Sequence, residues 1–122
     1  MTEYFFAKEE EIKDREQLVK VFNRREIGLF RLGDEYYAWE NNCPHMGGPV
    51  CQGRIINRVD ERLDNEKKSQ GYRYVEEDVH IVCPWHGYEF NIKTGGHPGD
   101  SKAQLKGFVV NVRSGEIYVE IE

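Results

Sequence analysis

Eight short runs rich in valine, isoleucine, phenylalanine and tyrosine recur along the chain, each bounded by residues that favour turns. These runs occupy residues 4–7, 18–22, 27–32, 36–39, 79–82, 88–92, 108–112 and 117–121. Runs of this length and spacing are typical of strands in an antiparallel sandwich or barrel. Gly33-Asp34 and Ser114-Gly115 lie between consecutive runs, where tight hairpin turns favour residues of this kind. We therefore predict an all-β fold, an antiparallel β-sandwich.

Length and composition limit the class of protein. At 122 residues the chain has the size of one domain, and we expect a single domain over residues 1–122. Hydrophobic and aromatic contents of 39% and 12% exclude global disorder. The net charge of −5 argues against nucleic acid as a partner. No apolar run approaches the roughly 20 residues that span a bilayer, so we expect a cytoplasmic protein without a membrane partner.

One charged stretch interrupts the pattern of apolar runs. Residues 54–78 contain six basic and seven acidic side chains, so 13 of these 25 positions are charged. Ile56, Val59 and Leu63 lie at i, i+3 and i+7, which is compatible with a short amphipathic helix, but an extended charged excursion explains the composition equally well. We expect a charged insertion at about residues 54–78 that projects from the domain, as a solvated segment or as a docking site for a partner.

Two segments each place a cysteine and a histidine in one loop that also contains glycine and proline. They are residues 43–49, CPHMGGP, and residues 83–87, CPWHG. The candidate ligands Cys43, His45, Cys83 and His86 suit zinc or an iron–sulfur centre rather than calcium or magnesium. Paired ligands of structural zinc are usually separated by two or more residues, so the Cys43–His45 spacing is tight for one tetrahedral ion. The spacing favours two loops whose paired ligands bind different irons.

With this spacing, Cys43-x-His45 followed by Cys83-x-x-His86-Gly87 resembles the Rieske iron–sulfur signature, and the likeness extends from about residue 18 to residue 121. The resemblance implies a Rieske-type β-sandwich in which the two loops form a cluster-binding subdomain. It also implies a 2Fe–2S cluster as the cofactor, with Cys43 and Cys83 on one iron and His45 and His86 on the other.

The sequence departs from the respiratory-complex subfamily at three positions. Gly48 and Trp85 occupy the places of two cysteines that form a loop disulfide in that subfamily, and Tyr88 replaces a residue that is often serine. The serine would donate a hydrogen bond to the cluster, and tyrosine at this position removes that donor. We therefore expect a reduction potential in the lower part of the Rieske range of about −150 to +300 mV.

The resemblance implies a one-electron carrier rather than an enzyme, a ferredoxin that passes electrons from a reductase to a terminal oxygenase or reductase. A Rieske oxygenase needs a further domain with a 2-His-1-carboxylate iron, and this chain is too short for one, so we predict no catalytic residues. Redox proteins are the expected partners, and no small-molecule substrate is expected. Two alternatives stay open: a small subunit of a nitrite-reductase-like complex, and a redox-sensing regulatory module.

Four further residues carry weaker signals. We interpret Cys51 as a small buried residue rather than a reactive thiol. His80 is expected in cross-strand packing or at the surface, and His97 in a surface turn rather than in a functional third loop. Trp85 lies between two candidate ligands and is expected either to contact a docking partner or to shield the cluster.

Overall fold

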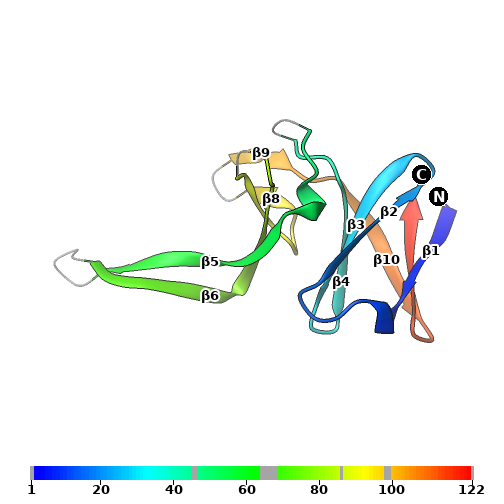
Figure 1. Cartoon of the computed structure of the whole chain (residues 1–122), viewed down its shortest axis with the longest axis horizontal. Helices are drawn as coiled ribbons and strands as arrows, with labels where there is room; N and C mark the ends of the chain where they lie inside the picture. The colour runs from blue at the N-terminus through cyan, green and yellow to red at the C-terminus, as the bar shows by residue number, and fades with distance from the viewer. Residues whose placement is uncertain (1, 45–46, 64–68, 86, 98–99, 122) are drawn as a thin grey trace.

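The computed structural model describes residues 2–44, 47–63, 69–85, 87–97 and 100–121, with side chains described in all of these except 58–63, 69–78 and 100–102. Figure 1 shows a body of antiparallel strands from which one long two-stranded arm projects. Every strand pairing in these ranges is antiparallel, which confirms the predicted all-β antiparallel class. Within the same ranges no helical segment is long and apolar enough to cross a bilayer.

The largest sheet has six strands in the order β1-β11-β10-β4-β3-β2. Its strands are β1 (Thr2–Lys8), β2 (Gln17–Phe22), β3 (Arg25–Leu32), β4 (Glu35–Glu40), β10 (Gly107–Arg113) and β11 (Glu116–Ile121), and each contains one of the predicted runs. Two hairpins turn at Gly33 and at Ser114-Gly115, as predicted. A third turns at Asn23-Arg24, where both residues have positive φ, 49° and 65°. Asn23 favours positive φ but Arg24 does not, and this turn was not among those predicted.

The sheet curls so that side chains of its two edge strands meet. The ring centroid of Phe22 in β2 lies 5.7 Å from that of Tyr4 and 5.4 Å from that of Phe6, both in β1. The Lys20 ammonium also donates a hydrogen bond to the main-chain oxygen of Phe6 at 2.6 Å. Curling encloses the first core cluster, whose buried residues are Phe6, Ala7, Ile12, Ile27, Leu29, Ala38, Ile117, Val119 and Ile121.

The charged stretch between the two Cys/His loops forms a β-hairpin. β5 (Arg54–Leu63) pairs with β6 (Ser69–Val82), and β7 (Glu89–Asn91) adds a third strand only beside residues 80–82. The remainder of β5 and β6 is the arm in Figure 1. The short amphipathic helix over Ile56, Val59 and Leu63 is therefore wrong, because the main chain of these residues is extended and pairs with the neighbouring strand.

A second core cluster lies between the large sheet and the base of the arm. Its buried residues are Phe30, Trp39, Cys43, Val50, Cys51, Val79, Ile81, Cys83, Phe90, Ile92, Ala103 and Leu105. Trp39 of β4 joins the two parts of the molecule, since its indole N–H donates to the main-chain oxygen of Ile92 at 2.7 Å. The remaining strands, β8 (Gly96–His97) and β9 (Asp100–Gln104), pair with each other. All three cysteines belong to this second cluster.

Candidate metal centre

The first Cys/His loop runs from the end of β4 to the start of β5. The Cys43 N–H donates to the main-chain oxygen of Gly48 at 2.8 Å, and the Gly47 N–H donates to that of Cys43 at 2.7 Å. Gly47 has a φ of 74°, which glycine adopts without strain. Farther along the loop, the Cys51 N–H donates to the Asn41 side-chain oxygen at 2.8 Å. These hydrogen bonds fix the main chain on both sides of the candidate ligands.

The second loop joins the end of β6 to the start of β7. The Cys83 N–H donates to the main-chain oxygen of Tyr88 at 2.7 Å, which closes the loop, and Gly87 turns it with a φ of 69°. Below the loop, Nδ1 of the buried His80 lies 3.2 Å from Oε1 of Glu89. This contact links the two strands that flank the loop. The cross-strand role predicted for His80 is confirmed, and its alternative surface position is wrong.

The two loops bring Cys43 and Cys83 together. Both are free thiols, only 2% and 1% exposed, and their side chains lie close enough to hydrogen-bond. Burial raises the pKa of the Cys83 thiol, the main-chain N–H of Trp85 lowers it by donating to the sulfur, and the Cys43 thiol raises it again. A bound cation would stabilise the Cys83 thiolate in a setting where burial alone disfavours it. The thiol pair therefore fits one half of an iron–sulfur site.

The other two candidate ligands, His45 and His86, lie outside the described residues. Where side chains are described, no group of three or more His, Cys, Asp or Glu residues is arranged to hold a metal ion. The structure thus brings together the two predicted sulfur ligands, and the two predicted imidazole ligands stay a prediction from spacing.

An aromatic cluster lies beside the second loop. The His97 ring of β8 lies 4.3 Å from the Tyr88 ring and 6.0 Å from the Phe90 ring, centroid to centroid. His97 is a half-buried strand residue, so its expected place in a surface turn is wrong. The sequence did not reveal this cluster, because the segment that carries His97 is brought to the loop only by the tertiary fold.

Cys51 has a packing role. It is fully buried, and its thiol donates to the main-chain oxygen of Trp39 at 3.4 Å. Burial raises the pKa of the Cys51 thiol to about 12. The predicted interpretation as a small buried residue is confirmed, since a thiol that stays protonated at neutral pH is a poor nucleophile.

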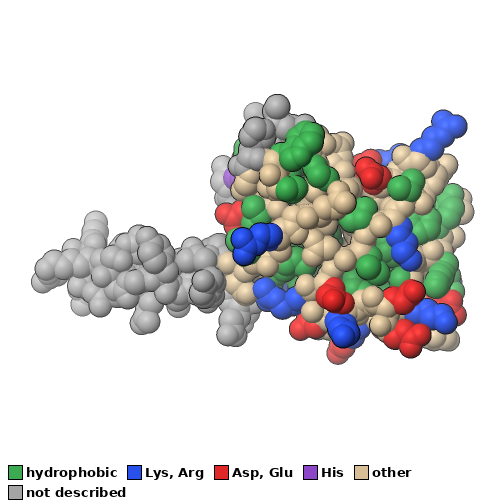
Figure 2. All heavy atoms as spheres, in the orientation of Figure 1, with side chains coloured by type: hydrophobic (Ala, Val, Ile, Leu, Met, Phe, Trp, Pro, Cys, Tyr) green, Lys and Arg blue, Asp and Glu red, His purple; other side chains and the backbone are tan. Residues whose placement is uncertain are grey.

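The exposed surface of the two loops consists of uncharged residues in its described part, several of them apolar. Pro44 and Pro84 are exposed, and Trp85 is 50% exposed. Figure 2 shows hydrophobic side chains at the upper end of the body, whereas many charged side chains gather along its lower edge. A protein that docks at the loops would therefore meet mainly uncharged groups.

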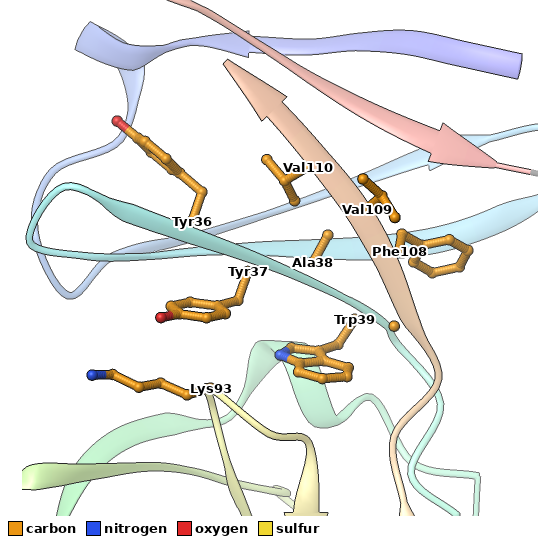
Figure 3. Close-up of a pocket in the computed structure, with 9 residues that line it drawn as sticks. Tyr36, Tyr37, Ala38, Trp39, Lys93, Phe108, Val109 and Val110 are labelled. Carbon is orange, nitrogen blue, oxygen red and sulfur yellow. The ribbon is translucent and has the colours of Figure 1, made fainter.

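A groove elsewhere on the surface has no part in this centre. Figure 3 shows it between β4 and β10, which pair only at two positions, Ala38 with Phe108 and Trp39 with Gly107. Its lining includes the side chains of Tyr37 and Lys93, and it contains no cysteine or histidine. Nothing in its lining suits a soft metal ion.

Comparison with known proteins agrees with this centre. Residues 2–112 match the family model of the Rieske [2Fe-2S] domain. A human Rieske domain-containing protein is 30% identical over 94% of this chain and 72% of its own length. Ferredoxin CarAc of Metapseudomonas resinovorans is 30% identical over 76% of this chain and 68% of its own length.

Two solved structures share the fold. The ferredoxin of carbazole 1,9a-dioxygenase from Nocardioides aromaticivorans superposes with a TM-score of 0.72 at 21% identity, with both chains covered completely. A candidate NADH-dependent nitrite reductase small subunit from Mycobacterium tuberculosis superposes with a TM-score of 0.74 at 15% identity, over 99% of this chain and 96% of its own. Taken with the family match over most of its length, these results show that the chain belongs to the Rieske [2Fe-2S] family.

Proposed function

We propose that this protein is a cytoplasmic one-electron carrier, a Rieske ferredoxin that passes electrons from a reductase to a terminal oxygenase or reductase. The observation that carries the proposal is the buried thiol pair of Cys43 and Cys83, which two separate loops bring into contact. In this proposal the two cysteines hold one iron of a 2Fe–2S cluster, and His45 and His86 hold the other. The family match and the similarity to ferredoxin CarAc support the assignment.

The bound cluster supplies reversible uptake of one electron. The protein contributes a dry and rigid setting for the sulfur ligands. Burial keeps water from Cys43 and Cys83, and the Trp85 N–H stabilises negative charge on the Cys83 sulfur. The hydrogen bond from the Cys83 N–H to Tyr88 holds the second loop in place. Little rearrangement of these residues is needed when the charge of the centre changes.

Electron exchange requires a partner to approach the two loops. We assign this contact to the apolar surface that Pro44, Pro84 and Trp85 contribute to, because apolar groups lose little solvation energy when a partner covers them. Both redox partners would use this surface in turn. A transient complex of this kind buries a small area and dissociates quickly.

We also propose that residues 1–122 form one Rieske domain in which residues 54–78 are an insertion. The base of the arm supports this organisation, since Val79 and Ile81 of β6 lie in the same core cluster as Cys43 and Cys83. Residues farther out on β5 and β6 pair only with each other among the described strands.

The main alternative is a small subunit of a nitrite-reductase-like complex. Its support is fold similarity, since the nitrite reductase small subunit is only 15% identical to this chain. Ferredoxin CarAc is 30% identical, and we therefore place the electron carrier of an oxygenase system first.

Reconstitution tests the proposal. The holoprotein is mixed with NADH, the reductase and the terminal oxygenase of a ring-hydroxylating system from the same organism, and its visible bands are followed. We expect uptake of one electron per chain from the reductase and complete reoxidation by the oxygenase. Absence of reoxidation, together with a stable stoichiometric complex with a nitrite reductase large subunit, would favour the alternative. A redox sensor would show neither turnover nor that complex.

A further inference from the structure

The side chain of Trp85 fills space directly above Gly48, so that the second loop packs on the first. A Cβ built on Gly48 would lie 2.8 Å from both Cγ and Cδ2 of Trp85 and 3.0 Å from its Cβ. These separations are shorter than the roughly 3.5–4.0 Å at which carbon atoms attract each other best. Gly48 is buried although Trp85 is half exposed, so the indole forms an outer wall over the glycine.

Gly48 and Trp85 each also make a main-chain hydrogen bond to one residue of the thiol pair. The main-chain oxygen of Gly48 accepts a hydrogen bond from the Cys43 N–H at 2.8 Å. The main-chain N–H of Trp85 donates to the sulfur of Cys83. The contact between Gly48 and Trp85 therefore completes a second series of contacts from Cys43 to Cys83. This series is separate from the contact between their thiols.

We propose that Trp85 is a positioning residue, whose side chain packs on Gly48 and thereby holds Cys83 at the distance from Cys43 that the cluster requires. The expected effect of Trp85 on the cluster rests on the proposed 2Fe–2S site. The positioning of Cys83 by Trp85 does not, because it also exists in the protein without its cluster. This packing is possible only because position 48 lacks a side chain, so the glycine and the tryptophan act as a pair.

Three variants test the packing of Trp85 on Gly48. Trp85→Ala removes it, whereas Trp85→Phe keeps atoms equivalent to the Cβ, Cγ and Cδ2 that contact Gly48, and it should restore most of the effect. Phe5→Ala is the matched control, because Phe5 is a 40% exposed aromatic residue of β1 whose ring contacts Tyr118 rather than either loop.

The first measurement uses the protein without its cluster. Oxidised glutathione converts the Cys43 and Cys83 thiols to a disulfide and accepts their two electrons and two protons to become two molecules of reduced glutathione. The equilibrium constant of this exchange gives the effective concentration of the Cys43 thiol with respect to the Cys83 thiol. We expect Trp85→Ala to lower this concentration about tenfold, the factor that corresponds to about 1.4 kcal/mol, while Trp85→Phe and Phe5→Ala stay close to the wild type.

The second measurement uses the loaded protein. Trp85→Ala should lose its visible bands about tenfold faster than the wild type and should shift the midpoint potential, and Trp85→Phe should restore both. If Trp85→Ala folds too poorly to assay, the double variant Gly48→Cys with Trp85→Cys replaces the contact by a covalent bridge. The Cβ separation of 3.0 Å is shorter than the roughly 3.5–4.5 Å found in disulfides, so the two loops must move apart slightly to close the bridge.

The bridged double variant should retain its cluster as long as the wild type does, and opening the bridge with a reductant should speed the loss. The proposal is overturned if Trp85→Ala matches the wild type in thiol equilibrium, cluster loss and potential, or if the bridged variant loses its cluster as fast when closed as when open. A changed thiol equilibrium in a protein that never assembles a 2Fe–2S cluster would support the positioning role and refute the proposed function.

Discussion

The thiols of Cys43 and Cys83 lie within hydrogen-bonding reach of each other, although the entire β5–β6 arm lies between the two residues in the chain. Each cysteine is held by a main-chain hydrogen bond of its own loop, to Gly48 in the first and to Tyr88 in the second. The two loops therefore hold the sulfur ligands within the body of the molecule. The arm that separates the two cysteines in the sequence projects from this body and is not needed to hold them.

Replacement of one paired cysteine should remove the cluster. Cys43→Ser and Cys83→Ser each exchange a thiolate ligand for a hydroxyl group, which is a poor ligand for this centre, so we expect loss of nearly all iron and acid-labile sulfide. The measurement is metal and sulfide analysis of the purified variants.

The third cysteine supplies the control for this experiment. Cys51→Ala should keep the full iron and sulfide content, because Cys51 packs in the core and donates to Trp39. It should lower the free energy of unfolding by about 1–2 kcal/mol, since it leaves a small cavity and removes the hydrogen bond from the thiol to Trp39. A cluster-free Cys51→Ala protein would show that our assignment of the ligands is wrong.

The strands of the body could be predicted because their signals are local. In β11, for example, Ile117, Val119 and Ile121 are buried and alternate with more exposed neighbours, which is the period-two pattern of a strand with one face on a core. The arm was ambiguous for the opposite reason. Its charged sequence has no clear period, and the pairing of β5 with β6 decides its conformation, which is why a helix over Ile56 and Leu63 was compatible with the sequence.

The candidate site likewise has features with a local sequence signal and features that depend on contacts between distant segments. Cys43 and Cys83 were expected to meet because the two loops resemble the Rieske signature, which implies that both cysteines bind one iron. The contact of Trp85 with Gly48 was not predicted, and neither was Glu89 as the residue that His80 contacts. Both depend on how separate segments pack or on strand register, and no local pattern encodes either of them.

The reduction potential should lie in the lower part of the Rieske range of about −150 to +300 mV, since Tyr88 replaces a serine donor. Tyr88→Ser should raise the potential, and Tyr88→Phe, which keeps a ring against His97 but has no hydroxyl group, should change it less. Potentiometric titration of the visible bands measures both. A wild-type midpoint near +300 mV at neutral pH would contradict this expectation.

Acid should remove one surface contribution to stability. Hydrogen bonds from Arg113 and Asn111 lower the pKa of Glu3 from 4.5 to about 2. Because the folded-state pKa lies below the unfolded value, this contribution is present above pH 4.5 and is lost as the pH falls toward 2. Urea unfolding should therefore find Glu3→Gln less stable than the wild type at pH 7, with a smaller difference at pH 3. In an Arg113→Gln background the difference should be small at both values.

The arm should be dispensable for the cluster. Replacing residues 57–75 by a short Gly/Ser linker should leave iron content and the visible spectrum intact and change stability by up to about 1 kcal/mol, because loop-closure entropy depends weakly on length. We expect slower electron transfer from the cognate reductase, measured by stopped-flow reduction. Loss of the cluster would show that the arm belongs to the core, and an unchanged rate would show that it is a solvated insertion.

The most direct test of the account is analysis of iron and acid-labile sulfide in the purified protein, combined with an EPR spectrum after reduction. We predict about two irons and two sulfides per chain and a rhombic signal whose average g value lies below that of plant-type ferredoxins, as expected when two imidazoles replace two thiolates on one iron. One zinc per chain without acid-labile sulfide would contradict the central claim.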